Sequence, residues 1–502
     1  MRMSPWTGGP LMLLPREPLR FLSDEEMERI HAAALRILAE IGMKIDHDDA
    51  LGALARAGCR VDEASRHVLF PREVVQSCVD KMRSDFASRE QPEKMSVRYS
   101  HVRFRREPFC IHPDFTVNAG GFCVFIYDLD GVRRPARLED TRSALRLVAQ
   151  LDGITHSGIP VAAQDVPLPI RPVKMAAELV KATDKLGGIE ALTPFDVEYI
   201  MRIGEVVRGS REELRRRPIL VGYAEAKTPL IIDRNMCDVF LAYIKHKMPQ
   251  SLDTMPNGGA TAPVHPAGTF ALGVAETLGG LVLAYAVDPD ACVTVDVTPS
   301  LCDMATGIFR YAGAERVSML GARVQMISEY YGCPSGVHGG KTDALVPDVR
   351  CGVEKGISML VPVLCGAIGF GTVGHLENAV TFSPAQLVMD SEIAQYVRRA
   401  VRGFEVTDDA INFDLIKKVG IGGNYLAEED TAARFRDIMH LSPFFRVEPW
   451  GADVRADEAR RWEKRAAEKA RELLKNDVPS PLSDDQVREI DRIVAEAEKK
   501  AL

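Results

Sequence analysis

The chain has 502 residues, of which 46% are hydrophobic and 27% are charged. These proportions are typical of globular proteins and exclude a disordered, collagen-like or coiled-coil chain. The net charge of −8 at pH 7 argues against binding to nucleic acid or to an anionic membrane surface. We therefore expect neither a nucleic-acid partner nor a membrane partner.

Ten cysteines are scattered along the chain, and no two of them form a CxxC pair. This spacing is not a disulfide framework, so we expect reduced thiols in a cytoplasmic protein. The N-terminal segment has no uninterrupted apolar stretch and no small-residue cleavage site, so no signal peptide is expected. Two uncharged stretches, 254–275 and 356–374, are interrupted by Gly and Pro. We interpret them as buried strand–turn–helix segments rather than membrane spans.

The first 85 residues are predicted to be helical. Ser23 and Glu26 form a capping-box signature, after which apolar residues recur at helical spacing. Further helices are expected over 47–57 and 71–82. Residues 86–136 are expected to form strands and turns, including a hairpin that turns at Asp130-Gly131. Residues 1–136 are thus predicted to be an N-terminal helical and hairpin region packed on the next domain.

From about residue 138, short apolar runs alternate with long amphipathic segments. Repeated βα units imply a parallel sheet, and about eight of them predict a (β/α)8 TIM barrel with its core over 137–403. A doubly wound open sheet is the alternative. The strand runs are 159–163, 218–222, 251–255, 292–297 and 363–370, with weaker runs at 187–191 and 333–337. The helices are 138–151, 170–185, 195–207, 233–246, 266–286, 312–331, 348–361 and 384–402.

After residue 403 the pattern changes, and 404–502 is predicted to be a C-terminal helical extension. Thr407 caps one helix, and the glycines of 420–424 indicate a tight turn. The stretch 454–502 is rich in Arg, Lys, Glu and Ala. It predicts two exposed helices separated near Pro479-Ser480-Pro481, either solvated or in contact with another subunit.

In a barrel, the chemistry lies where strands end and βα loops begin. Polar residues beside glycines cluster at these expected strand ends, which makes them a candidate site as a set, although each one alone is more often structural. The candidates are Tyr223, Glu225, Asp253, Asp296, Cys302, Asp303, His338, Lys341, Asp343, Phe370, His375 and Glu377.

Several other motifs in the sequence do not match the cofactor-binding or metal-binding patterns that they partly resemble. The glycines of 366–371 do not form a dinucleotide fingerprint. His265 and Gly268 match half of a corrinoid-binding DxHxxG pattern, but Pro263 stands where the Asp is needed, so we expect no corrinoid bound tightly to this chain. The cysteines lack the short spacing of a zinc site, so we predict no metal.

A series of short sequence pieces runs along the chain, from the helix at Ile30–Gly42 to about residue 450. They are Tyr127–Pro135, Thr228–Leu230, Gly259–Pro263, Ala275–Gly280, Asp303–Gly307, Thr342-Asp343, Asp348, Glu354 and Asp390–Ile393. Each piece is short, but in this order they resemble the trimethylamine methyltransferase superfamily. The resemblance implies a (β/α)8 barrel that moves a methyl group from a methylated amine to cob(I)alamin on a partner corrinoid protein.

Founding members of that superfamily use pyrrolysine, whereas this sequence has only the twenty standard residues, including in segment 332–348. This difference points to the non-pyrrolysine branch, whose members resemble methyltransferases for quaternary amines. Glycine betaine is the preferred substrate on this interpretation, and a homo-oligomer is expected.

The chemistry of a quaternary amine fits these candidates. Its leaving group is a neutral amine, so no general acid is required, and the protein has to position and desolvate the substrate. A permanent cation requires aromatic faces and carboxylates. Tyr223, Glu225, Asp253, Phe370 and Glu377 are the candidates for this role, although Glu225 and Asp253 are equally compatible with internal ion pairs.

A betaine carboxylate requires hydrogen-bond donors, for which we predict His338, Lys341 and the backbone of Gly339-Gly340. Two other functions stay open from the sequence. One is a zinc-assisted methyltransferase for a thiol or methoxy compound, and the other is a non-catalytic betaine-binding protein.

Overall fold

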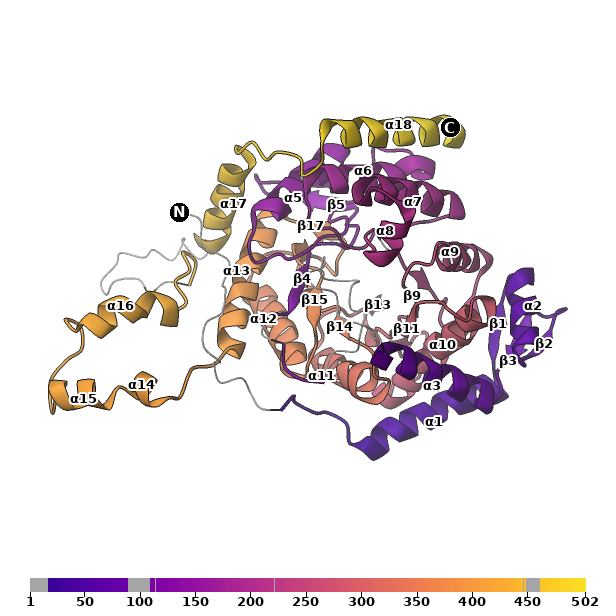
Figure 1. The fold of residues 1–502 in the computed structure, drawn as a ribbon, viewed down its shortest axis with the longest axis horizontal. Helices are drawn as coiled ribbons and strands as arrows, with labels where there is room; N and C mark the ends of the chain where they lie inside the picture. The colour runs from indigo at the N-terminus through magenta and orange to yellow at the C-terminus, as the bar shows by residue number, and fades with distance from the viewer. Residues whose placement is uncertain (1–16, 89–108, 113, 221, 446, 448–460) are drawn as a thin grey trace.

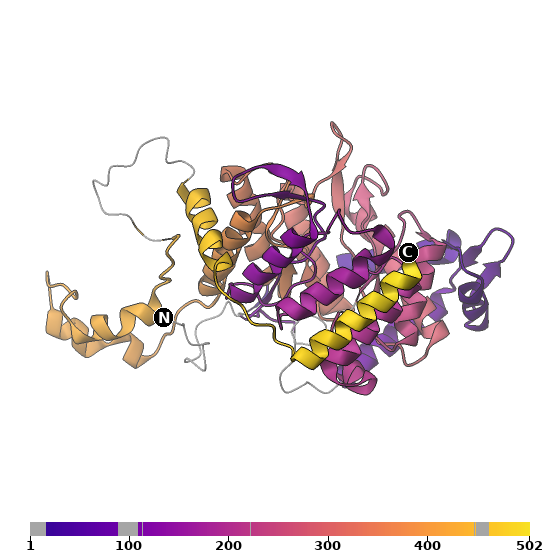
Figure 2. The same cartoon turned by 90° about the horizontal axis from the view of Figure 1, so that it is seen from above.

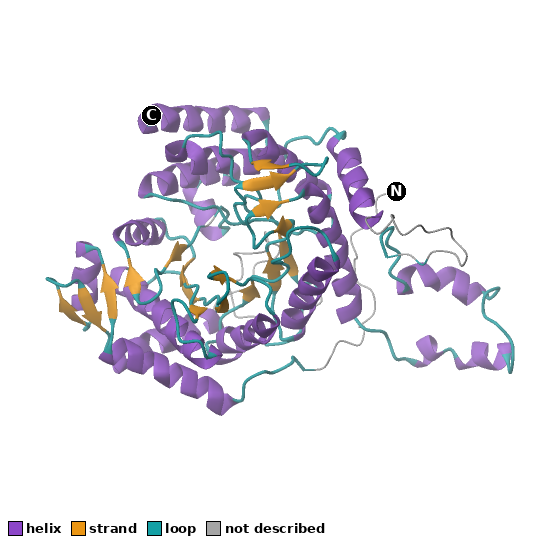
Figure 3. Cartoon of the chain, turned by 180° about the vertical axis from the view of Figure 1, so that it is seen from behind, coloured by secondary structure: helices purple, strands orange, loops and turns teal. Residues whose placement is uncertain are grey.

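The computed structural model describes residues 17–88, 109–112, 114–220, 222–445, 447 and 461–502. Short strands lie at its centre and long helices surround them (Figures 1 and 3). The segment tested for a signal peptide lies mostly outside the described residues, as does the stretch 89–108 that was expected to form strands and turns.

Eight chain segments follow one another around the centre, and the pairings recorded between neighbours are all parallel. β14 pairs with β15, β15 with β4, β4 with the segment at His156, and Ser157 with Leu186. β7 pairs with β9, and β9 with β11. The strands are β4 (Thr116–Asn118), β7 (Ala224–Glu225), β9 (Gln250–Asp253), β11 (Val293–Val295), β14 (Gly336–Val337) and β15 (Gly369–Gly371).

No ladder joins Leu186 to β7, or β11 to β14, among the described residues. The predicted mixed α/β architecture is confirmed, while closure into a (β/α)8 barrel is not seen in the pairing. β4 belongs to the central strands although it falls within the predicted N-terminal region. The proposed division at residues 136 and 403 stays a prediction.

The helices that surround the strands match the predicted amphipathic segments. They are α5 (Leu138–Gln150), α6 (Arg171–Ala182), α7 (Pro194–Arg208), α8 (Arg211–Arg216), α9 (Arg234–Lys245), α10 (Pro266–Val287), α11 (Ala314–Val324), α12 (Val349–Leu364) and α13 (Pro384–Val401), with short turns η1 (Leu168–Ile170) and η2 (Gln325–Tyr330). α8 was not predicted. The single helix expected over 312–331 is instead α11 continued by the π-helical η2. By length and composition alone α10 is apolar enough to cross a membrane, but most of it is buried inside the protein.

The predicted strand runs 159–163, 187–191 and 218–222 do not form strands, and the run 363–370 is a strand only at its end. Residues 159–163 contribute only an isolated bridge at Val161, and the described residues of 218–222 precede β7 without forming a strand. Most of the run 363–370 is not extended, because α12 continues through Pro362 to Leu364 and only β15 is a strand. A short buried apolar run has no periodicity that separates a strand from the end of a buried helix.

The N-terminal region packs against α10. α1 (Asp24–Glu40) has the predicted capping box, in which Ser23 and Glu26 bond each other's backbone. α2 (Asp48–Arg56) and α3 (Arg72–Ser88) are also confirmed. Beside them lies a sheet of β2 (Arg60–Asp62), β3 (His67–Leu69), β1 (Met43–Ile45) and β8 (Ile231–Ile232).

Two small sheets lie next to the central strands. The predicted hairpin at Asp130-Gly131 is confirmed, since β5 (Phe125–Tyr127) and β6 (Arg133–Pro135) pair antiparallel. It joins β16 (His375–Leu376) and β17 (Thr381–Phe382) in one sheet. The other sheet contains β10 (Asn257–Gly258), β12 (Ser300–Asp303) and β13 (Ile308–Phe309).

The C-terminal part has two different segments. Residues 404–438, which we call the arm, hold α14 (Asp408–Ile411), α15 (Phe413–Val419) and α16 (Glu429–Ile438) and project from the body (Figures 1 and 2). α17 (Arg461–Leu474) and α18 (Asp484–Ala501) return to it, with α17 on α13 and α5 and α18 on α6 and α7. The tail helices were expected to be solvated or to contact another subunit. They bury apolar residues such as Ile490 and Ile493 against this same chain.

Candidate active site

A cavity of about 120 Å³ lies among the central strands. A single water needs only about 10–15 Å³ of such space, so the cavity has room for a small organic molecule. Gly222, Gly336, Gly369 and Gly371 contribute only backbone to its wall. The polar side chains of the wall are Thr116, Asn118, His156, Tyr223, Gln250, Ser251, Asp253, Thr294, Asp296, Arg323, Ser335, His338 and Thr372.

Three carboxylates occupy one level on one side of the site. Glu225 of β7 is paired in register with Asp253 of β9. Leu252 is paired with Val295, so Asp296, the residue after β11, stands level with Asp253. Residues at paired positions of parallel strands face the same side of a sheet. We call Glu225, Asp253 and Asp296 the acidic row.

Burial makes the acidic row hard to ionise fully. It raises the pKa of Asp253 well above its usual range, and the neighbouring Asp296 raises it further. Burial also raises the pKa of Glu225, although this side chain keeps an exposed surface. Charged carboxylates close together in a poorly solvated wall favour a cation between them.

The opposite charge comes from α11, next to the row. Arg323 is 3% exposed, and its Nη2 donates to Asp296. Two turns earlier on the same helix, Arg316 donates to the carbonyls of Pro299, Tyr311 and His338. These two arginines lie between β11 and β14, where no ladder is recorded. The two arginine side chains therefore make hydrogen bonds in the place where a backbone ladder would otherwise join β11 to β14.

Lys341 lies above an aromatic ring. Its Nζ is 3.7 Å from the centre of the Tyr311 ring. Burial, and then the positive charge of Arg316, lower the pKa of Lys341 to about 7, while Glu225 acts in the opposite direction. Burial raises the pKa of Tyr311 to about 12. Near neutral pH, Lys341 therefore exists in both protonation states, which is uncommon for a lysine.

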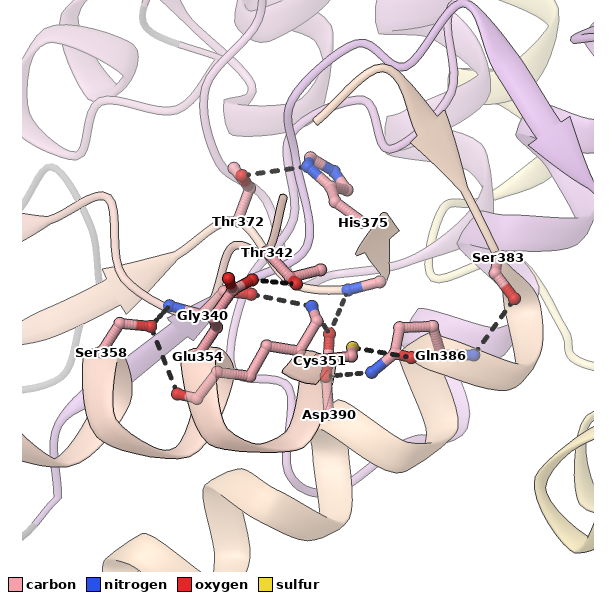
Figure 4. Close-up of polar contacts among 12 residues, drawn as sticks. Gly340, Thr342, Cys351, Glu354, Ser358, Thr372, His375, Ser383, Gln386 and Asp390 are labelled. Carbon is pink, nitrogen blue, oxygen red and sulfur yellow. Dashed lines mark hydrogen bonds and ion pairs between the residues drawn. The ribbon is translucent and has the colours of Figure 1, made fainter. Parts of the chain in front are cut away.

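The loop that carries Lys341 is fixed from below by α12 (Figure 4). Ser358 accepts a hydrogen bond from the Gly340 N–H, and Lys355 Nζ donates to the Gly340 carbonyl over 2.8 Å. Lys355 also pairs with Asp390 at 2.7 Å, and neither side chain is exposed. Glu354 accepts from the Thr342 hydroxyl. These buried contacts define where the Lys341 backbone stands.

The structure places the nine predicted site residues in three settings. Tyr223, Asp253, His338 and Phe370 line the cavity. Glu225 and Lys341 are not among the lining residues, but Glu225 stands beside Asp253 and interacts electrostatically with Lys341. Asp343, His375 and Glu377 have partners elsewhere, and the role of each of the nine stays a prediction.

Asp343 accepts from the backbone N–H groups of Tyr311 and Ala312. Glu377 pairs with Arg133 at 2.8 Å. His375 is fully buried, where Thr372 lies 3.2 Å from its Nδ1, and burial lowers its pKa well below the usual value. None of these three side chains is part of the cavity wall.

The sequence prediction missed Arg323, Tyr311 and Asn118. Arg323 stands seven residues after Arg316 inside a predicted amphipathic helix, which places both on one helix face. Two charged residues on the side of a helix that is otherwise apolar are the signal that was available. Asn118 and Tyr311 carry no such signal, because their positions depend on long-range packing.

Metal ligands were not expected, and the residues that the structure describes hold no group of three or more His, Cys, Asp or Glu suited to a metal ion. All ten cysteines are free thiols. Metal-free activity stays a prediction.

Comparison with known proteins assigns the chain to a family. The family described as "Trimethylamine methyltransferase (MTTB)" matches residues 9–501. Trimethylamine methyltransferase MttB of Methanosarcina barkeri is 30% identical over 372 residues, 72% of this chain and 73% of the relative. Glycine betaine methyltransferase of Desulfitobacterium hafniense is 28% identical over 381 residues, 75% of this chain and 78% of that protein.

Among solved structures, the monomethylamine methyltransferase MtmB of Methanosarcina barkeri is similar, with a TM-score of 0.48 at 12% identity. The alignment covers 90% of this chain and 94% of that one. The resemblance noted in the sequence is confirmed by the match over almost the whole chain. The chain is a methyltransferase and belongs to the trimethylamine methyltransferase family.

Proposed function

We propose that this enzyme transfers a methyl group from a small quaternary amine, preferably glycine betaine, to a corrinoid carried by a partner protein. The proposal includes closure of the eight central segments into one (β/α)8 barrel. The observation that carries it is the acidic row beside a cavity of about 120 Å³. A relative named glycine betaine methyltransferase supports the choice of substrate.

The cavity wall suits a permanent cation. Tyr223 lines the cavity and offers an aromatic face, which attracts a quaternary ammonium through its π electrons. The ring of Phe370 instead packs in the core, with its centre 5.1 Å from that of the Phe115 ring. Asp253 and Asp296 offer negative charge in a poorly solvated place, where an ion pair is stronger than in water. A quaternary ammonium cannot donate a proton to these carboxylates, so the attraction persists at any pH at which they are ionised.

The protein's contribution to the reaction is to position and desolvate the substrate. The corrinoid of the partner supplies the nucleophile and accepts the methyl group. The departing amine is neutral and requires no proton from the enzyme, so none of the cavity residues has to act as an acid. Holding the methyl carbon in line with its acceptor in a dry site is a recognised source of rate acceleration.

His338 and Lys341 remain the proposed donors to a substrate carboxylate. His338 lines the cavity. The pKa of Lys341 is lowered to about 7, so the protonated fraction falls as the pH rises and with it the strength of this donor. Replacing His338 by Ala is expected to raise the KM for glycine betaine by roughly ten- to a hundredfold and to leave the KM for tetramethylammonium nearly unchanged.

A panel of methylated amines tests the substrate class. Purified enzyme is mixed with cob(I)alamin and glycine betaine, tetramethylammonium or trimethylamine, and methylation is followed by absorbance. Quaternary amines are expected to react and trimethylamine to react negligibly. Comparable rates with trimethylamine would overturn the proposal, as would methyl transfer that is insensitive to Asp253→Asn.

We also propose that the enzyme is cytoplasmic and forms a homo-oligomer. The ten free thiols are consistent with a reducing compartment. The exposed apolar residues of the arm are consistent with a contact between subunits. Size-exclusion chromatography with light scattering measures the oligomeric state directly. A monomer at micromolar concentration would refute the proposal of a homo-oligomer.

A further inference from the structure

We propose that Arg323 binds the carboxylate of a zwitterionic substrate and so makes the site selective for carboxylated quaternary amines. This inference rests on the proposed function and names a residue that the sequence did not point to. Three properties of Arg323 support it, namely its burial, its unused hydrogen-bond donors and its place in the cavity wall beside the acidic row.

Arg323 has more donors than it uses. A guanidinium carries five N–H groups. One nitrogen, Nη2, donates to Asp296, whereas Nε and Nη1 have no hydrogen-bond partner within the described part of the chain. Buried donors without partners are rare in proteins because burial removes the water that would otherwise satisfy them. A ligand oxygen in the cavity would supply the missing acceptors, because Arg323 is part of the cavity wall.

Arg316, on the same helix, provides a comparison because its hydrogen bonds go to backbone carbonyls of the protein. Its Nε and Nη1 donate to three backbone carbonyls, and it does not line the cavity. One of its nitrogens, Nη2, also has no hydrogen-bond partner among the described residues, but Arg316 is not one of the residues that line the cavity. Arg323 differs because it is part of the wall of a cavity that a ligand can enter.

The neighbouring charges restrict which ligand fits. A simple anion beside Arg323 would also lie close to Asp253 and Asp296, whose negative charges oppose it. A simple cation would leave the donors of Arg323 unpaired. A zwitterion satisfies both groups, with its carboxylate on Arg323 and its ammonium toward Asp253. In an α-betaine one CH₂ group separates the two charges, and Arg323 is close enough to Asp253 for the guanidinium charge to act on that carboxyl group.

The geometry of the guanidinium favours a carboxylate over other anions. A guanidinium presents parallel N–H groups that match the two oxygens of a carboxylate, and lysine cannot reproduce this fork. Arg323→Lys is therefore the informative variant. It keeps a positive charge for Asp296 and removes the planar set of donors.

The test measures binding of glycine betaine and of choline, which has a hydroxyl in place of the carboxylate, by titration calorimetry on the full-length protein. Arg323→Lys is expected to weaken glycine betaine binding by roughly ten- to a hundredfold and to change choline binding by less than about twofold. Arg398→Lys is the matched control, because Arg398 donates to the carbonyls of Gly153 and Phe115 and does not line the cavity. It is expected to change neither affinity.

Unchanged betaine affinity in Arg323→Lys, an equal loss for both ligands, or a wild-type protein that binds neither ligand would overturn the inference. If circular dichroism shows that Arg323→Lys is not folded, the double variant Arg323→Gln/Asp296→Asn is compared with Asp296→Asn alone, so that the loss of the Asp296 charge is common to both proteins. Methyl transfer to cob(I)alamin separates this inference from the proposed function. Betaine binding that depends on Arg323 without any methyl transfer would refute the function alone, and transfer that does not depend on Arg323 would refute the inference alone.

Discussion

The central strands and the arm use charged residues in opposite ways. Around the cavity, charges pair in buried or half-buried places, since Lys355 and Asp390 are both buried, and the buried Arg323 pairs with the half-buried Asp296. In the arm, no residue of α14, α15 or α16 is buried, and charges pair on the surface, as Lys418 does with Glu428 at 2.6 Å. Figure 2 shows the arm projecting from the body.

The difference matters because the two kinds of pair have different energies. A surface pair is screened by water and contributes about 0–1 kcal/mol. A buried pair adds little net stability compared with apolar residues, but losing one partner leaves an uncompensated buried charge. The charge pairs around the cavity therefore fix the positions of the side chains that form them. The helices of the arm depend instead on local contacts.

The largest effect is expected at the buried pair beneath the Lys341 loop. Lys355→Met leaves Asp390 without its cation and should lower the free energy of unfolding by about 3–5 kcal/mol. Urea denaturation followed by circular dichroism measures this loss. The double variant Lys355→Met/Asp390→Leu should recover a large part of it. A loss below about 1 kcal/mol in the single variant would show that the pair does not behave as a buried one.

Asp253→Asn is the next largest expected effect. The substitution removes one carboxylate of the acidic row while keeping its size, so affinity for tetramethylammonium should fall by roughly tenfold or more. Glu178→Gln is the control, since Glu178 pairs with Arg142 on the outer helices at 2.9 Å. Titration calorimetry compares both variants with the wild type. Equal affinities in all three proteins would remove the acidic row from the cation site.

Smaller effects are expected from pH. The pKa of Lys341 is lowered to about 7, so the lysine is charged below this pH and neutral above it. The pKa of Asp253 is raised, so this group gains negative charge as pH rises. Both changes favour a cation at higher pH. Affinity for tetramethylammonium should therefore increase between pH 6 and pH 8, by up to roughly tenfold.

Lys341→Met isolates the lysine's part of this change. The increase in affinity between pH 6 and pH 8 should become smaller in the variant, because only the carboxylates still titrate. The same titration series on both proteins gives the comparison. An affinity that falls with rising pH, or identical pH profiles for the two proteins, would contradict the assignment of Lys341 to the electrostatics of the site.

Much of this architecture could be predicted from the sequence because it depends on local patterns. Helices with caps and a 3.6-residue period, such as α1 with Ser23 and Glu26, needed no tertiary information. The short strands were harder. β14 and β7 have two residues each and are held by partners far away in the chain, so their extent cannot be read from a local apolar run.

The cavity was predictable only in part for the same reason. Tyr223 and His338 follow expected strands and Asp253 lies within one, and general barrel architecture points to such positions. Arg323 lies on a helix, and its role depends on the position of Asp296 and on the absence of a ladder between β11 and β14. Glu377 occupies a strand end but turns toward Arg133, and no sequence pattern reveals which way a loop side chain points.

The smallest effect is expected in the arm, where two phenylalanines make a matched comparison. Phe413 in α15 is 67% exposed, whereas Phe382 in β17 is fully buried. Phe413→Ala should change the free energy of unfolding by less than about 0.5 kcal/mol. Phe382→Ala should lower it by about 3–5 kcal/mol, because it leaves a cavity in the core. Urea titrations at two protein concentrations measure both effects. If Phe413→Ala destabilises the protein by more than about 1.5 kcal/mol, the arm is packed against another surface in solution. A loss that grows with protein concentration would identify that surface as a second subunit, because only an intermolecular contact depends on concentration.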